Sequence, residues 1–89
     1  MPTIAIFFGI AVRMFFLDTK QHNLPHIHVE YQSRKAVILI PSGELIEGDL
    51  PPKKLALVRR WIALRQAELM DNWQHAVNGE PVAQIPPLE

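Results

Sequence analysis

Apolar and polar positions alternate with a period of two in the first half of the chain. Residues 26–31 read His-Ile-His-Val-Glu-Tyr, in which every second residue is apolar or aromatic, and this pattern predicts a strand with one face on the core. Further strands are predicted over 10–17, 36–40 and 44–50, separated by loops and turns rich in Pro, Gly, Ser and Asn. Connections this short favour an antiparallel meander of three to five strands.

The spacing of apolar residues changes to a helical one after Pro51-Pro52, where proline is tolerated because the first turn of a helix needs no N–H from it. The residues that then share one stripe are Leu55, Val58, Ile62, Leu69, Trp73 and Ala76. Asn78-Gly79 predicts the helix end. The pattern leaves open whether 52–78 form one helix or two with a break near 66–71.

These elements predict a single α+β domain over residues 1–89. Residues 1–50 form the β-sheet part, residues 51–79 form one long or two consecutive helices packed on one face of the sheet, and residues 80–89 form an extended tail. A chain of 89 residues with 48% hydrophobic residues is long enough for one core and too short for two.

A second apolar wing lies beside the core stripe of the helix. Its residues are Leu57, Trp61 and Leu64. Burying each such side chain is worth roughly 1.5–3 kcal/mol, and tryptophan is common at binding hot spots. We therefore expect this strip to be covered, either by residues 82–88 folding back or by another chain, which would be a partner or a second copy.

Composition narrows the protein class. The chain has no cysteine, so neither a disulfide framework nor a thiolate metal site is available, and a small domain without disulfides is expected in the cytoplasm. The apolar N-terminal segment lacks a basic region and is interrupted by Arg13, which favours core over a signal peptide or membrane span. Net charge is zero, but all nine Lys and Arg precede residue 66, so the basic part could bind an anion.

Three chemically capable side chains share one face of the predicted strand 26–31: His26, His28 and Glu30. Two imidazoles and a carboxylate suit a first-row divalent metal such as zinc or iron, with His26 and His28 as ligands. The same set suits acid–base chemistry. His22 could reach this face, and Arg13 on the neighbouring strand could bind an anionic group. The alternative is that these residues only solvate an outer sheet face.

The predicted helix also carries a basic surface, formed by Lys53, Lys54, Arg59, Arg60 and Arg65. Lys53 and Arg60 lie most squarely opposite the core stripe, so they are the candidates for contacts with phosphates or an acidic partner. Simple solvation of the helix is the alternative. His75 is expected to have a structural role near the helix C-terminus, where a cation is favourable.

The chain resembles domain-of-unknown-function family 4160, a family of short bacterial proteins with a Pro-His-aromatic-His-Val-Glu-Tyr motif. The segments that carry the resemblance are Pro2-Thr3-Ile4, Gly9-Ile10, Arg13-Met14, Leu24–Tyr31, Gly43-Glu44-Leu45, Glu47-Gly48, Trp61 and Asn72-Trp73. Leu24 stands where the family usually has proline, and Ile27 stands where it has an aromatic residue. Both departures leave the two histidines and Glu30 in place.

The resemblance implies a genetic setting and no settled reaction. Members are often encoded beside a small protein of domain-of-unknown-function family 2442, which suggests a toxin–antitoxin-like module with this chain as the toxin. The leading hypothesis is therefore action on nucleic acid or a nucleotide, with His26 or His28 as acid or base, Arg13 stabilising charge, and Lys53 and Arg60 positioning phosphates. A non-catalytic interaction module and a metal-dependent small-molecule enzyme are the alternatives.

Overall fold

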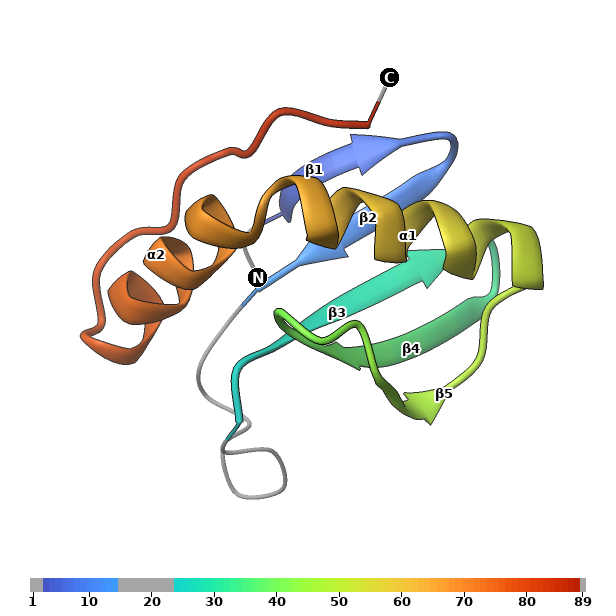
Figure 1. The fold of residues 1–89 in the computed structure, drawn as a ribbon, viewed down its shortest axis with the longest axis horizontal. Coiled ribbons are helices and arrows are strands. Elements are labelled where there is room, and N and C mark those ends of the chain that lie inside the picture. Colours follow the sequence, from blue (N-terminus) through green and yellow to red (C-terminus); the bar gives the residue numbers. More distant parts are fainter. Residues whose placement is uncertain (1–2, 15–23, 89) are drawn as a thin grey trace.

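The computed structural model describes residues 3–14 and 24–88 as five strands followed by two helices. The elements are β1 (Thr3–Phe7), β2 (Ile10–Arg13), β3 (His26–Tyr31), β4 (Arg34–Leu39), β5 (Leu45–Gly48), α1 (Pro52–Leu64) and α2 (Gln66–Val77). Each strand pairs antiparallel with the next along the chain, in the order β1-β2-β3-β4-β5. Figure 1 shows α1 crossing the sheet and α2 continuing beyond it. The predicted α+β class with an antiparallel meander is confirmed.

The N-terminal strands differ from the prediction of one strand over 10–17. Two strands are present, joined by a tight turn at Phe8 and Gly9, which have φ angles of 51° and 78°. Positive φ at both positions matches the twist of an antiparallel pair, and phenylalanine is an uncommon choice there. The residue types at this turn therefore do little to indicate it. Residues 15–17 lie outside the described part of the chain.

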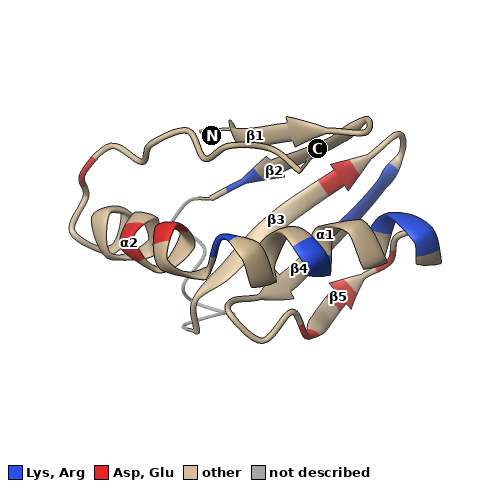
Figure 2. Ribbon diagram, turned by 45° about the horizontal axis from the view of Figure 1, so that its top comes forward, with Lys and Arg blue, Asp and Glu red and all other residues tan. Residues whose placement is uncertain are grey.

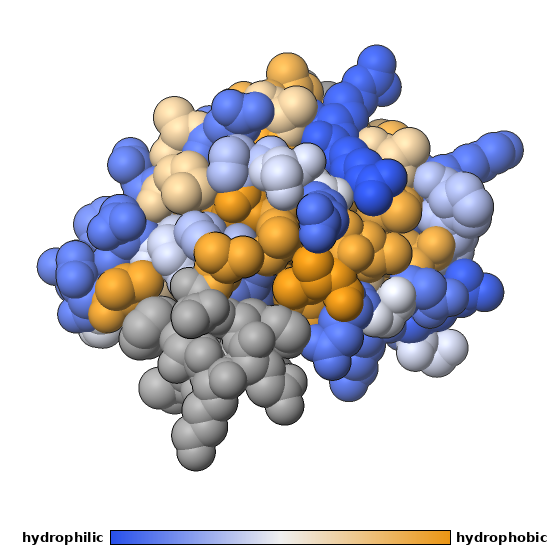
Figure 3. Space-filling model, turned by 60° about the horizontal axis from the view of Figure 1, so that its bottom comes forward, coloured by the Kyte–Doolittle hydropathy of each residue, from blue (hydrophilic) through white to orange (hydrophobic). Residues whose placement is uncertain are grey.

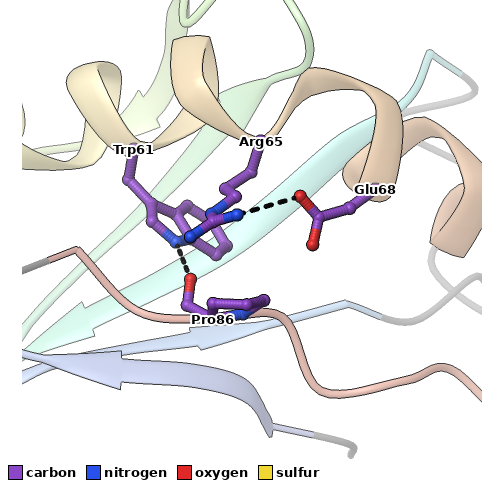
Figure 4. Close-up of polar contacts among 4 residues, drawn as sticks. All are labelled: Trp61, Arg65, Glu68 and Pro86. Carbon is purple, nitrogen blue, oxygen red and sulfur yellow. Dashed lines mark hydrogen bonds and ion pairs between the residues drawn. The ribbon is translucent and has the colours of Figure 1, made fainter.

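The helical region consists of two helices that meet at Arg65. This residue leaves the helical conformation with φ −116° and ψ 28°, while its N–H still bonds to the carbonyls of Trp61 and Ile62. Its guanidinium pairs with Glu68 in the first turn of α2 at 3.3 Å (Figure 4). In the part of the chain that the structure describes, no helix is long and apolar enough to cross a membrane.

The core lies between the helices and one face of the sheet. Ile27 and Val29 of β3 are buried in it, together with Val58 and Trp61 of α1. The ring of Trp61 packs 5.3 Å from the ring of Phe7 on β1, centroid to centroid. Because side chains alternate along a strand, His28 and Glu30 project from the opposite face of the sheet.

The tail, residues 80–88, folds back over the helices and reaches β1 (Figure 1). The N–H of Ile85 donates to the carbonyl of Ile4 at 2.8 Å, and the indole N–H of Trp61 donates to the carbonyl of Pro86 at 2.8 Å. Ile85 is buried in the core. Of the two ways in which the apolar strip was expected to be covered, the structure contains the fold-back of the tail.

Candidate functional site on strand β3

Strand β3 lies in the middle of the sheet, which brings side chains from both neighbouring strands beside its polar residues. Arg13 of β2 stands opposite His28, and Val37 of β4 stands opposite His28 on the other side. Lys35 of β4 stands opposite Glu30. Opposed residues of an antiparallel pair have Cβ atoms about 4.5–5.5 Å apart, so a cation, an imidazole and a carboxylate occupy one small area.

Arg13 and Glu30 form an ion pair across β2 and β3. The guanidinium Nη1 donates to Oε1 of Glu30 at 2.6 Å, and each side chain is 33% exposed. This hydrogen bond from Arg13, with the charges of Arg13 and Lys35, holds the pKa of Glu30 below its usual 4.5, against the opposing effect of burial. Glu30 is therefore an anion at neutral pH, and its first role is to orient Arg13.

His26 is fully buried at the start of β3. Its Nδ1 lies 2.8 Å from the carbonyl of Leu24, so in the neutral ring the proton is assigned to Nδ1, which donates to that carbonyl, and the lone pair to Nε2. The ring centre lies 5.1 Å from that of His28 and 5.1 Å from that of Trp73 on α2. His28 itself is half-buried. Of the two histidines, His28 is the less buried, although its Nε2 atom is shielded from solvent, and His26 packs against it.

A three-ligand metal site is not assembled from the residues that the sequence indicated. Within residues 3–14 and 24–88, no group of three or more His, Cys, Asp or Glu side chains could hold a metal ion. Glu30 is held by Arg13, and Nδ1 of His26 is held by a backbone carbonyl. His22 lies outside the described residues.

The basic surface of α1 does not join this site. Lys53 and Arg60 are exposed on the helix layer, which packs against the other face of the sheet from His28, and Figure 2 shows the basic positions of α1 on that layer. Lys54 is used within the fold, since its ammonium bonds to the carbonyl of Phe8 at 3.2 Å and lies 4.9 Å from the ring centre of Tyr31. The phosphate contacts predicted on α1 and the acid–base residues thus lie on opposite sides of the protein.

The predicted partner strip on α1 is divided by the fold. Trp61 is fully buried and Leu57 packs against the core, whereas Leu64 is 65% exposed. Trp61 is thus a core residue rather than a partner contact, because the tail covers it. His75 bonds to Glu80 at 2.8 Å through Nδ1, which fits the structural role expected near the end of α2.

Asn72 is a residue whose part in the fold the sequence pattern did not reveal. It is 3% exposed, its amide nitrogen donates to the carbonyl of Ala83 at 2.8 Å, and its amide oxygen accepts from the N–H of Ala83 at 3.0 Å. The signal was present: Asn72 interrupts the apolar stripe between Leu69 and Trp73. A buried amide needs partners, and a backbone segment supplies a donor and an acceptor side by side.

The ion pair between Arg13 and Glu30 predicts that Glu30→Gln lowers the stability of the fold by an amount that depends on pH. A carboxyl whose folded pKa is lowered contributes stability above its unfolded pKa, and that contribution is lost as the pH falls through the folded pKa. The free energy of unfolding should therefore differ between wild type and variant near neutral pH, and the difference should shrink below pH 4.5. Urea unfolding at a series of pH values measures it.

Arg13→Gln removes the same pair from the other side and is the matched control for Glu30→Gln. The difference in the free energy of unfolding between wild type and Arg13→Gln should also shrink towards low pH. If the difference in the free energy of unfolding between wild type and each variant stays constant from neutral to acidic pH, the ion pair does not stabilise the fold.

A known family matches most of the sequence of this chain. The family described as "Domain of unknown function (DUF4160)" matches residues 9–74, which include β2 to β5, α1 and most of α2. No curated protein and no solved structure matches the chain.

Proposed function

The chain belongs to the DUF4160 family, which is described only as a domain of unknown function, and from its site we propose that it is the toxin-like component of a bacterial two-protein module. The target is nucleic acid or a nucleotide, and the working surface is the face of β3 that bears His28 and Glu30. Neither the module nor the target follows from the family description, so the proposal depends on the residues.

The observation that supports it best is the opposition of Arg13 and His28 on neighbouring strands, with Glu30 orienting Arg13 at 2.6 Å. An imidazole is the side chain best suited to accept and release protons near neutral pH. A guanidinium is suited to a phosphate and to the charge that develops on it. Because Nε2 of His28 is buried, His28 would exchange the proton with an oxygen of the phosphate ester through Nδ1, and Arg13 would stabilise the negative charge. His26, fully buried, would position the ring of His28.

A nucleotide and a nucleic acid strand can be told apart, because His28 and the basic residues of α1 lie on opposite sides of the protein. A mononucleotide held at His28 would be too small to reach Lys53 and Arg60, which lie on the helix layer. A nucleic acid strand is long enough to contact both. Under this proposal, weaker binding in Lys53→Gln/Arg60→Gln favours a strand, and unchanged binding favours a nucleotide.

Induced expression in bacteria tests the proposal. Wild-type protein should arrest growth, and co-expression of the small protein encoded beside it should relieve the arrest. His28→Gln should lose the effect, because a positioned acid or base contributes typically 10²–10⁴-fold to a rate. Leu64→Ala, an exposed change on α1, is the control and should stay toxic. If His28→Gln arrests growth as wild type does at equal soluble levels, the acid–base role is wrong.

A non-catalytic interaction module is the second candidate, and exposed apolar side chains favour it. The described residues with such side chains include Ile6, Phe8, Leu24, Ile46, Leu64 and Val77, and Figure 3 shows apolar surface gathered in a band on one side of the molecule. In this case His28→Gln would retain its effect on growth and its co-purification with the neighbouring protein. An Asp substitution at Leu64 or Ile6 would abolish both.

A further inference from the structure

The tail occupies a groove in which three residues bind main-chain atoms of the tail, and the side chain of Gln84 adds one bond to the carbonyl of Thr3 at 2.6 Å. Asn72 binds the N–H and the carbonyl of Ala83, and the indole N–H of Trp61 binds the carbonyl of Pro86 (Figure 4). The carbonyl of Ile4, on β1, accepts the N–H of Ile85 at 2.8 Å. This is the way in which proteins recognise an extended peptide: main-chain hydrogen bonds give affinity, and a pocket for a side chain gives selectivity.

Ile85 fills that pocket. It is 3% exposed, whereas its neighbours Gln84 and Pro86 are exposed. An empty groove would leave the amide of Asn72 and the indole of Trp61, which are 3% and 0% exposed, without the bonds that the tail supplies. Buried polar groups without partners cost about 1–3 kcal/mol each. The groove therefore needs an occupant of this chemistry, but nothing in its contacts requires the occupant to come from the same chain.

The connection between α2 and the tail allows the tail to leave as a unit. Gly79 has φ +73°, and nothing within 4 Å would meet a side chain there. The side-chain contact that follows it, between His75 and Glu80, is about half exposed on both sides, so it is weak, and the main-chain bond from the N–H of Glu80 to the carbonyl of His75 at 2.8 Å belongs to the end of α2 and stays with the helix. Pro81 and the pair Pro86-Pro87 keep the tail extended when it is undocked.

We propose that this groove accepts the C-terminal segment of a second copy of the chain, so that two copies exchange tails and form a dimer. Each groove keeps the same bonds as in the monomer, to Ala83, Ile85 and Pro86 of the other copy. Exchange of an identical element costs little, because each groove binds its partner's tail through the same bonds that it makes to its own. The proposal concerns the face of the protein away from His28, and it does not depend on the proposed function.

The test mixes two full-length variants that are damaged on different sides of the contact. Asn72→Leu damages the groove and keeps the tail intact, and Ala83 is exposed, so its freed N–H and carbonyl can bind water. Ile85→Asp damages the tail and keeps the groove intact. Each variant alone should be a monomer with an undocked tail. Mixed, the intact tail should enter the intact groove and give a 1:1 species of twice the mass in sedimentation velocity.

Tryptophan fluorescence gives a second readout, because the docked tail accepts the indole N–H of Trp61 through Pro86, and loss of the tail should expose this ring to water. The mixture should regain a blue-shifted emission that neither variant shows alone. In the control mixture, the double variant Asn72→Leu/Ile85→Asp replaces Asn72→Leu, and neither recovery should occur. If either single variant does not fold, Asn72→Ala and Ile85→Ala provide milder damage. A mixture that stays monomeric, with unchanged emission at millimolar concentration, overturns the proposal.

Discussion

Trp61→Ala should destabilise the protein by about 3–5 kcal/mol, the usual cost of truncating a buried aromatic residue to alanine. The ring is fully buried, packs 5.3 Å from the ring of Phe7 and carries the N–H that holds Pro86. The substitution therefore opens a cavity and releases the end of the tail together. Since native domains of this kind are stable by only about 5–15 kcal/mol, the variant should be partly unfolded at about 37 °C. Urea unfolding followed by far-UV circular dichroism measures the loss.

Leu64→Ala is the matched control for Trp61→Ala. Both residues belong to the apolar strip predicted on α1, but Leu64 is 65% exposed, so its removal should change stability by less than about 0.5 kcal/mol. Equal and small effects at the two positions would show that the tail does not protect Trp61 in solution, and that the strip is free for a partner.

Gly48→Ala should be similarly damaging, for a reason that lies in the backbone. A Cβ at this position would collide with the carbonyl of Lys35 on the paired strand β4, and φ is +73°. Backbone cannot move aside as a flexible side chain can. Left-handed strain costs about 1–3 kcal/mol in a non-glycine residue, and overpacking adds about 1–3 kcal/mol. We expect a loss of about 2–6 kcal/mol and weakened pairing of β5, measured by urea unfolding and by exchange of the β4 amides.

Gly79→Ala is the control that separates the backbone strain from the collision with β4. Gly79 has the same φ of +73°, but no atom lies within 4 Å of the place that a Cβ would take, so the backbone strain applies without the collision, at about 1–3 kcal/mol. If Gly48→Ala costs no more than Gly79→Ala, β5 adjusts to the added atom and its pairing with β4 is looser than its geometry implies.

Much of the fold could be predicted because local patterns and tertiary packing agree. The alternation in residues 26–31 fixes which side chains of β3 enter the core, and Ile27 and Val29 are buried accordingly. The helix start at Pro52 follows from the tolerance of proline in the first turn. The break at Arg65 could not be located, because no glycine or proline marks it and the apolar stripe continues through it from Ile62 to Leu69.

The candidate site was predictable as a set of residues but not as an arrangement. Alternation places His28 and Glu30 on one face, and the neighbouring strand β2 brings Arg13 near. The alternation of residues does not indicate that Glu30 pairs with Arg13 rather than with an imidazole, because the partner of Glu30 depends on the register of β2 against β3. Nor does it indicate that His26 is buried against Trp73, a contact between residues far apart in sequence.

The return of the tail to β1 has a consequence for the order of folding. Every pairing in the sheet joins a strand to its immediate successor, and the longest of these connections, between β2 and β3, spans 12 residues, so the meander has low contact order. The bond from Gln84 to the carbonyl of Thr3 joins residues 81 positions apart, and its loop-closure entropy is correspondingly large unless the intervening chain is already compact. The tail thus docks on a surface that the sheet and both helices have built, and it closes the structure as the last element to form.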